Sequence, residues 1–399
     1  MNPLTVVAGA MLVQQTLITF ASNAVPVLLP PISEAFQINP GLLGVFTSFL
    51  FGVGIAAAVA SGGFILRYGA FRVSQFCLAA AGVGLLLCGL GWLWLFPVAA
   101  MFLGLGMGPS TPASSHILAR FASPEAAPLV FSIKQTGVPF GGMFAGLFLP
   151  FAVAVSGWQG GLIAGACLCW IFALLLWPMH SRYDDDRQPH RRLSVADIGL
   201  ALKTAVGSRN MAELAFAGFA FSGLQVAFTS YFVAYLVEDA ARPYAQAGQM
   251  LAWASATAIA GRIFWGLLAG RVLPSRPLLA FLSWAMVAAT LGVALLGPES
   301  SRLGVIMAGV LMGATTVSWN GVHLAEVARL APAGNASVAT AGVLFCCFSG
   351  LLVLPGAFGA IVAFTGNYDL GFYVAAAPTA IAGIILLRRT TPTGQRQAP

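Results

Sequence analysis

The chain has 399 residues, of which 59% are hydrophobic and only 8% are charged. Soluble globular proteins carry about a quarter charged residues, so this composition excludes a soluble domain and, with a mean hydropathy of +0.88, indicates an integral membrane protein. The formal net charge of +7 implies no nucleic-acid partner, because the basic residues follow the pattern of a membrane topology.

Polar segments divide the chain into twelve apolar stretches. A helix needs about 20 apolar residues to cross the hydrocarbon core of a bilayer. The opening MNPLTVVAGAM has no basic region before its apolar run and no small-residue cleavage site after it, so we interpret it as a retained first helix rather than a signal peptide. The expected transmembrane helices are 5–29, 41–62, 74–95, 97–119, 128–152, 159–178, 211–236, 246–269, 278–297, 303–324, 337–363 and 370–388.

Lysine and arginine residues concentrate in every second connection between these helices. The other connections hold only Arg242 and Arg302. Because basic residues favour the cytoplasmic side, this pattern predicts a multi-pass protein of a bacterial-type cytoplasmic (inner) membrane, with both termini cytoplasmic. The connections predicted to be cytoplasmic and the tail carry Arg67, Arg72, Arg120, Arg182, Arg187, Arg191, Arg192, Lys203, Arg271, Arg276, Arg329, Arg388, Arg389 and Arg396.

The longest polar segment lies near the middle of the chain. Within it, Ser194, Asp197 and the apolar run that follows indicate a capping box that opens a short helix along the cytoplasmic face. A simple tether is one interpretation of this segment, and a regulatory loop is the other. The expected division is an N-terminal six-helix half at 1–178, a cytoplasmic linker at 179–205 and a C-terminal six-helix half with a short tail at 206–399.

The two halves repeat, which supports two six-helix units related by an axis along the membrane normal. Three matches recur in chain order at a nearly constant separation. They pair Phe20 and Ser22 with Phe228 and Ser230, Gly62 and Arg67 with Gly266 and Arg271, and MGPST at 107–111 with MGATT at 312–316.

The connection after the second helix reads GGFILRYGAFR. Together with the six-plus-six helices and the central basic loop, it resembles the major facilitator superfamily over essentially the full chain. Gly62, Arg67 and Gly69 match the family's loop motif, and Arg72 lies one place beyond its usual basic pair. Leu66 stands where the family has Asp, which puts in doubt the charge pair between helices that many members make.

The resemblance implies an all-α fold of twelve transmembrane helices in two pseudo-symmetric halves. It also implies a conformational or gating role for Gly62, Arg67, Gly69 and Arg72. In the second half, GLLAGRV repeats the loop motif with Gly266 and Arg271, so these two residues are expected to share that role. The alternative for the arginines is simple anchoring at the cytoplasmic surface.

The fifth helix opens with SIKQTGVPFGG, which resembles the Gly-Pro-rich motif that exchangers of the family use to bend this helix. Gly137 and Pro139 are expected to bend it, because Pro removes a backbone donor. The bend is interpreted first as a kink and second as a mechanistic hinge.

Lys134 and Arg262 lie deep in apolar stretches, each ~10 Å from a helix end at 1.5 Å per residue. A charge near the bilayer centre costs at least ~2.5–3.5 kcal/mol, and such charges usually mark a substrate or ion pathway. In the family the fifth and eighth helices face each other, so the resemblance implies that both cations border one cavity. AGRIFWG, around Arg262, looks like the arginine placement of monocarboxylate carriers and oxalate/formate exchangers.

These cations predict a site for a small organic anion, most simply a carboxylate. In the alternative interpretation, Lys134 extends to the interface and Arg262 caps carbonyl groups of a neighbouring helix. Amide and aromatic side chains on the lining helices are expected to complete the substrate site. These are Gln135, Asn23, Gln225, Tyr231, Trp319 and Asn320.

The means of driving transport is left open between proton symport and anion exchange. Glu213, His116 and His323 could carry a coupled proton, or could be interfacial anchors. The absence of a mid-membrane acid disfavours the alternative of a multidrug or metabolite efflux antiporter. The sequence has no catalytic arrangement and no metal-ligand spacing, so we expect no enzyme activity, cofactor or metal. We expect a secondary transporter that works by alternating access and is monomeric.

Overall fold

The computed structural model describes residues 3–38, 42–190, 195–242 and 244–388, and these residues are largely helical. The helices of the first half are α1 (Pro3–Val27), α2 (Leu29–Phe36), α3 (Leu42–Tyr68), α4 (Ala70–Gly89), the 3-10 turn η1 (Leu93–Leu95), α5 (Phe96–Phe121), α6 (Ala127–Gln135), α7 (Gly137–Leu175) and α8 (Trp177–Tyr183). After these come α9 (Val195–Val206), α10 (Arg209–Glu238), α11 (Tyr244–Leu268), α12 (Ser275–Ala294), α13 (Arg302–Thr316), α14 (Asn320–Leu330), α15 (Ala336–Thr365) and α16 (Tyr368–Leu387).

Eleven segments of the described residues are long and apolar enough to cross a membrane. One of them, Ala127–Tyr183, has 57 residues and therefore holds two crossings. The chain turns between them at Gly157, whose φ of 73° lies in the left-handed region that glycine tolerates. Two crossings here bring the total to twelve and confirm the predicted fold class.

Two predicted helices differ from the structure in their continuity. The tenth, expected as 303–324, is broken into α13 and α14, and Ser318 at the break donates its hydroxyl to the carbonyl oxygens of Gly313 and Ala258. The fifth is broken into α6 and α7. The short helix expected in the linker exists as α9, while Ser194 lies outside the described residues.

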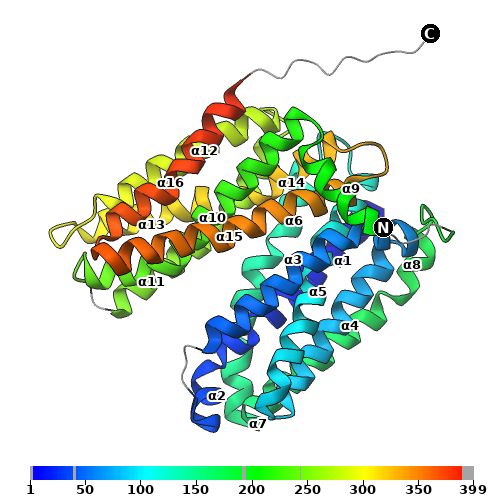
Figure 1. Ribbon diagram of the computed structural model, residues 1–399, viewed down its shortest axis with the longest axis horizontal. Coiled ribbons are helices and arrows are strands. Elements are labelled where there is room, and N and C mark those ends of the chain that lie inside the picture. The colour runs from blue at the N-terminus through cyan, green and yellow to red at the C-terminus, as the bar shows by residue number, and fades with distance from the viewer. Residues whose placement is uncertain (1–2, 39–41, 191–194, 243, 389–399) are drawn as a thin grey trace.

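The helices gather into two groups, each with its own buried apolar cluster (Figure 1). One cluster draws mainly on residues 7–183 and the other on residues 205–386. Close helix approaches depend on glycine: a Cβ at Gly350 would lie 2.0 Å from the carbonyl oxygen of Phe219, so α10 and α15 pack backbone to backbone. The domain boundaries themselves stay a prediction.

The two groups meet at one end of the molecule and diverge toward the other (Figure 1). The contact pairs α3 with α15, and α6 with both α11 and α14. Gly62 packs on Val338, and Gly266 packs on Ser132. We call this the contact end and the opposite one the far end. The ends of α3, α5 and α11 lie at the contact end, and Arg67, Arg120 and Arg271 lie at or just after these helix ends.

Candidate functional site

Arg262 on α11 joins the two halves through backbone carbonyl groups. Its Nε donates to the carbonyl oxygen of Val317, 3.1 Å away, and a terminal nitrogen donates to the carbonyl oxygen of Gln135. Val317 is the C-cap residue of α13, so its carbonyl group lies at a broken helix end. Arg262 is 1% exposed and is held between an N-terminal and a C-terminal helix.

Pro139 explains why the carbonyl group of Gln135 is free to bind Arg262. In a continuous helix the N–H of residue 139 would donate to the carbonyl oxygen of residue 135, and proline has no N–H. Pro139 therefore both breaks the fifth helix and leaves an acceptor at the break. The structure thus places the expected bend beside Gln135, with Thr136 between α6 and α7.

Lys134, also 1% exposed, is held by two amide oxygens. Its Nζ donates to Oε1 of Gln15 at 2.6 Å and to Oε1 of Gln135 at 3.0 Å. It does not extend to an aqueous surface. Gln135 therefore contacts both cations, through its side chain for Lys134 and through its backbone for Arg262.

Within the described residues, neither cation forms an ion pair with a carboxylate. Their partners are neutral oxygens, so two positive charges are concentrated in a protein interior where Coulomb interactions are poorly screened. Lys134 and Arg262 are each 1% exposed, and three cavities of about 790, 430 and 230 Å³ are lined by other residues. In this conformation the two cations are therefore enclosed by protein.

Gln15 belongs to a polar stripe on α1 that sequence reasoning missed in part. Its Nε2 donates to Oγ1 of Thr19 at 3.3 Å, and Nδ2 of Asn23 donates to the carbonyl oxygen of Thr19 at 2.8 Å. The spacing of four residues places Gln15, Thr19 and Asn23 on one helix face. The stripe extends over two turns, ~12 Å, from Lys134 toward the far end. The pair of consecutive glutamines in an apolar helix was the available sequence signal.

The remaining predicted substrate residues lie in the C-terminal half. Nε1 of Trp319 donates to Oε1 of Gln225 at 3.1 Å. The hydroxyl of Tyr231 donates to the carbonyl oxygen of Pro355 at 3.2 Å, and its ring stacks on a core phenylalanine. Oδ1 of Asn320 is buried without a partner among the described residues. None of these four side chains has a recorded hydrogen bond to Lys134 or Arg262.

The three residues considered for proton coupling have other partners. Glu213 pairs with Arg276 and with Arg209, the latter at 2.9 Å. A ring nitrogen of His323 lies 2.8 Å from the carbonyl oxygen of Leu214. Nε2 of His116 lies 2.7 Å from an oxygen of Asp186. None of them contacts the two buried cations.

Asp184 binds the start of α4, next to the loop in which Leu66 stands where the family has Asp. Its two carboxylate oxygens accept the backbone N–H groups of Phe71 and Arg72 at 3.0 and 3.1 Å, which caps the N-terminus of α4. Gly69, at φ 97°, leaves room for this carboxylate. Burial raises the pKa of Asp184, against the opposing effect of the two N–H donors. The sequence signal was the run of three Asp residues after the sixth helix.

The neighbouring acids bind the end of α5. Arg120 donates to Asp185 and to Asp186, each at 2.7 Å. The hydrogen bond from Arg120 lowers the pKa of Asp185. Burial tends to raise the pKa of Asp186, but the bond to His116 and the nearby charges outweigh it, so the pKa is lowered.

The other loop residues have separate surroundings. Arg72 donates to the ring of His180 at 3.0 Å and lies over the ring of Trp177. The guanidinium of Arg67 lies 5.3 Å from the ring of its neighbour Tyr68. Arg271 is exposed, and Gly137 packs against α1. Their conformational role stays a prediction.

The two helical groups, with buried charges where they meet, define a polytopic membrane transporter. The profile of the Major Facilitator Superfamily matches residues 11–355, and the chain belongs to that family. It is therefore a transporter rather than an enzyme, and a multi-pass membrane protein. The expected family resemblance is confirmed. No curated protein matches the sequence.

Solved structures of similar fold include two proton symporters and an organic anion transporter. The E. coli fucose:proton symporter superposes with a TM-score of 0.77 at 16% identity, covering 97% of this chain and 100% of that one. A proton:xylose symporter gives 0.76 at 13% identity, covering 97% and 96%. The human organic anion transporter gives 0.80 at 14% identity, covering 97% and 100%. At these identities the likeness shows the fold alone.

Proposed function

We propose that this transporter moves a small organic anion, most simply a carboxylate, by alternating access between its two halves. The observation that carries the proposal is the pair of buried cations Lys134 and Arg262, which have neutral oxygens as partners and no carboxylate among the described residues. An arriving carboxylate would supply the missing negative charge, and arginine can bind it through two parallel hydrogen bonds.

The site lies where the two halves must move relative to each other. Arg262 bonds to Gln135 across the contact between α11 and α6. A substrate carboxylate that takes over donors of Arg262 competes with that bond, so binding acts directly on the contact between the halves. The polar stripe of Gln15, Thr19 and Asn23 offers amide and hydroxyl groups along α1 on the side toward the far end. In this proposal, the C-terminal half contributes four side chains to the substrate site: Gln225, Trp319, Tyr231 and Asn320.

We place the contact end in the cytoplasm of a cell with an inner membrane, because the basic connections gather there. The conformation described is then closed toward the cytoplasm. Both termini are cytoplasmic in this topology, and the protein functions as a monomer.

Anion exchange, or symport of a proton together with the anion, fits the site better than a dedicated proton-binding acid does. The two buried cations need no titratable partner to exchange one anion for another. Glu213 and His116 are engaged by Arg276 and Asp186, and His323 by a backbone carbonyl group. Their participation in proton coupling would require these contacts to break.

Thermal stabilisation of the detergent-purified full chain tests the substrate class. The probes are a series of monocarboxylates and dicarboxylates, neutral sugars and lipophilic cations. A ligand at 100 times its Kd adds about 2.7 kcal/mol to the native state. We expect a carboxylate to raise the unfolding temperature and the other classes to leave it unchanged. Stabilisation by lipophilic cations alone would instead support the efflux antiporter.

Variants of the two cations test their role. Arg262→Ala and Lys134→Met should remove the stabilisation by carboxylate and abolish uptake into proteoliposomes. Because Arg262 also binds two helix ends, Arg262→Lys is included to keep the charge without the paired donors. Arg302→Ala is the matched control, since Arg302 is an exposed arginine at the start of α13. Normal transport by a folded Arg262→Ala variant would contradict the proposal.

A further inference from the structure

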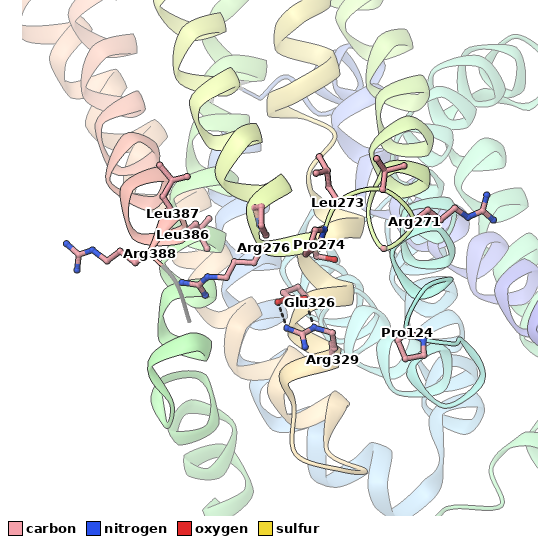
Figure 2. A pocket seen from close by; sticks show the side chains of 14 residues that line it. Pro124, Arg271, Leu273, Pro274, Arg276, Glu326, Arg329, Leu386, Leu387 and Arg388 are labelled. Atoms are coloured by element: carbon pink, nitrogen blue, oxygen red, sulfur yellow. Dashed lines mark hydrogen bonds and ion pairs between the residues drawn. The ribbon is translucent and has the colours of Figure 1, made fainter. Parts of the chain in front are cut away.

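A cavity of about 790 Å³ lies at the contact end, away from Lys134 and Arg262. Its wall is built mainly by the turn between α11 and α12 and by the ends of α14 and α16 (Figure 2). Four arginines line it, together with one acidic residue, Glu326. The arginines are Arg271, Arg276, Arg329 and Arg388.

Two of these arginines have no acidic partner. Arg329 donates from Nε and a terminal nitrogen to the two oxygens of Glu326 at 2.8 and 2.7 Å, and Arg276 pairs with Glu213. Arg271 and Arg388 are exposed, and within the described residues their side chains form no hydrogen bond or ion pair. Figure 2 shows them on opposite sides of the Glu326–Arg329 pair. The cavity wall therefore carries a positive excess.

Backbone and buried donors add to this excess. The 20-residue helix α12 begins at the cavity with Ser275, and no side chain caps it. Free N–H groups at a helix N-terminus attract anions, and the helix dipole strengthens the attraction. Arg276 is nine-tenths buried, and its Nε and one terminal nitrogen have no hydrogen-bond partner among the described residues. The site thus holds more donors than the protein satisfies.

Part of the cavity lining is apolar and exposed. Val272 is 69% exposed and Leu387 is 63% exposed, and Leu273 beside them is also exposed. A soluble phosphate would leave these side chains in water, whereas the acyl chains of a lipid would cover them. Basic pockets between membrane helices near the cytoplasmic surface suit anionic lipid headgroups.

We propose that this cavity binds the phosphate of an anionic phospholipid headgroup, with its acyl chains on Val272, Leu273 and Leu387. The phosphate would accept hydrogen bonds from the N-terminus of α12, while Arg271 and Arg388, on opposite sides of the cavity, would add positive potential around it.

The position of the cavity links the lipid to the conformation of the transporter. Pro124, from the connection between α5 and α6, lines it opposite the C-terminal residues. A second cavity of about 230 Å³ next to it is lined by Pro124, Phe131 and Ala127 from the first half and by Ser275 and Arg329 from the second. A headgroup here contacts both halves only while the contact end is closed. The bound lipid therefore favours that conformation.

Native mass spectrometry of the full chain in detergent, titrated with phosphatidylglycerol, tests this site. Each arginine near an anionic lipid surface contributes roughly fivefold in affinity. The double variant Arg271→Gln/Arg388→Gln should therefore weaken phosphatidylglycerol binding about 30-fold. Arg182→Gln is the matched control, since Arg182 is an exposed arginine on α8 outside the cavity and should leave binding unchanged. Phosphatidylcholine should bind the wild type and the double variant equally.

Two results would overturn the proposal. One is equal binding of phosphatidylglycerol to the wild type and the double variant. The other is thermal stabilisation by inorganic phosphate or glycerol phosphate without stabilisation by phosphatidylglycerol, which would assign the cavity to a soluble phosphate. The experiment uses no transported substrate, so its outcome is independent of the carboxylate assigned to Lys134 and Arg262.

Discussion

Replacing Asp184 should destabilise the N-terminal half, because this one side chain caps α4. The carboxylate is 2% exposed and accepts two backbone N–H groups at 3.0 and 3.1 Å. Loss of an N-cap side chain costs ~0.5–2 kcal/mol, and hydrogen bonds to charged groups contribute ~1.5–3 kcal/mol each. The charge at Asp184 is disfavoured by burial, which raises its pKa, so the lower part of the combined range applies. We expect Asp184→Ala to cost about 2–3 kcal/mol.

Thermal unfolding in detergent, followed by tryptophan fluorescence, measures this effect. A loss of 2 kcal/mol lowers the midpoint by about 4–8 °C for a unit of 150–250 residues. Asp184→Asn keeps one acceptor oxygen and should fall between the wild type and Asp184→Ala. Asp185→Ala is the control, since Asp185 is 70% exposed and its ion pair with Arg120 is worth less than ~1 kcal/mol. If Asp184→Ala shifts the midpoint no further than Asp185→Ala does, the capping role is refuted.

Three further predictions concern the contact end. Gly69→Ala should destabilise by more than ~2 kcal/mol, because φ is 97° and the added Cβ would lie 2.2 Å from a carboxyl carbon; a midpoint within 1 °C of wild type would contradict this. The pKa of Asp186 is lowered, so its carboxylate stabilises the folded protein. The difference in stability between the wild type and Asp186→Asn should therefore be fully present above pH ~4 and should disappear as pH falls through the lowered pKa. Thermal unfolding of both proteins between pH 3 and 7 tests this. Gly266→Val should hinder closure, since a Cβ there would lie 2.5 Å from Ser132; labelling of Ser132→Cys should rise at least tenfold, and unchanged labelling would exclude the hindrance.

Much of the fold could be predicted from composition and segment length. Twelve apolar stretches and the basic connections reflect the bilayer, which acts on each helix independently of its neighbours. The break in the tenth helix could not be predicted in this way. Its break at Val317 and Ser318 involves a hydroxyl that bonds to the neighbouring helix α11, and a pattern within one segment does not record that contact.

The two charged residues of the candidate site could be predicted from the sequence, but the residues that form hydrogen bonds with them could not. Lys134 and Arg262 stand out because a charge in an apolar segment is rare. Gln15 and Asp184 carry only a weak sequence signal, since the role of each depends on a residue more than 100 positions away. The sequence predicts a bend at Pro139, but the role of the carbonyl group of Gln135 that Pro139 leaves free depends on Arg262 from the other half.

The bond between Arg262 and the carbonyl group of Gln135 bears on how the empty transporter behaves. Opening the contact end separates α11 from α6 and therefore breaks this bond. Without an anion, the guanidinium would then lose a partner in a poorly solvating interior, which raises the barrier for the unloaded protein. In the proposed function, a bound anion would replace the lost partner before the halves move. We therefore expect loaded protein to reorient faster than empty protein, so that counterflow of two anions outpaces net flux.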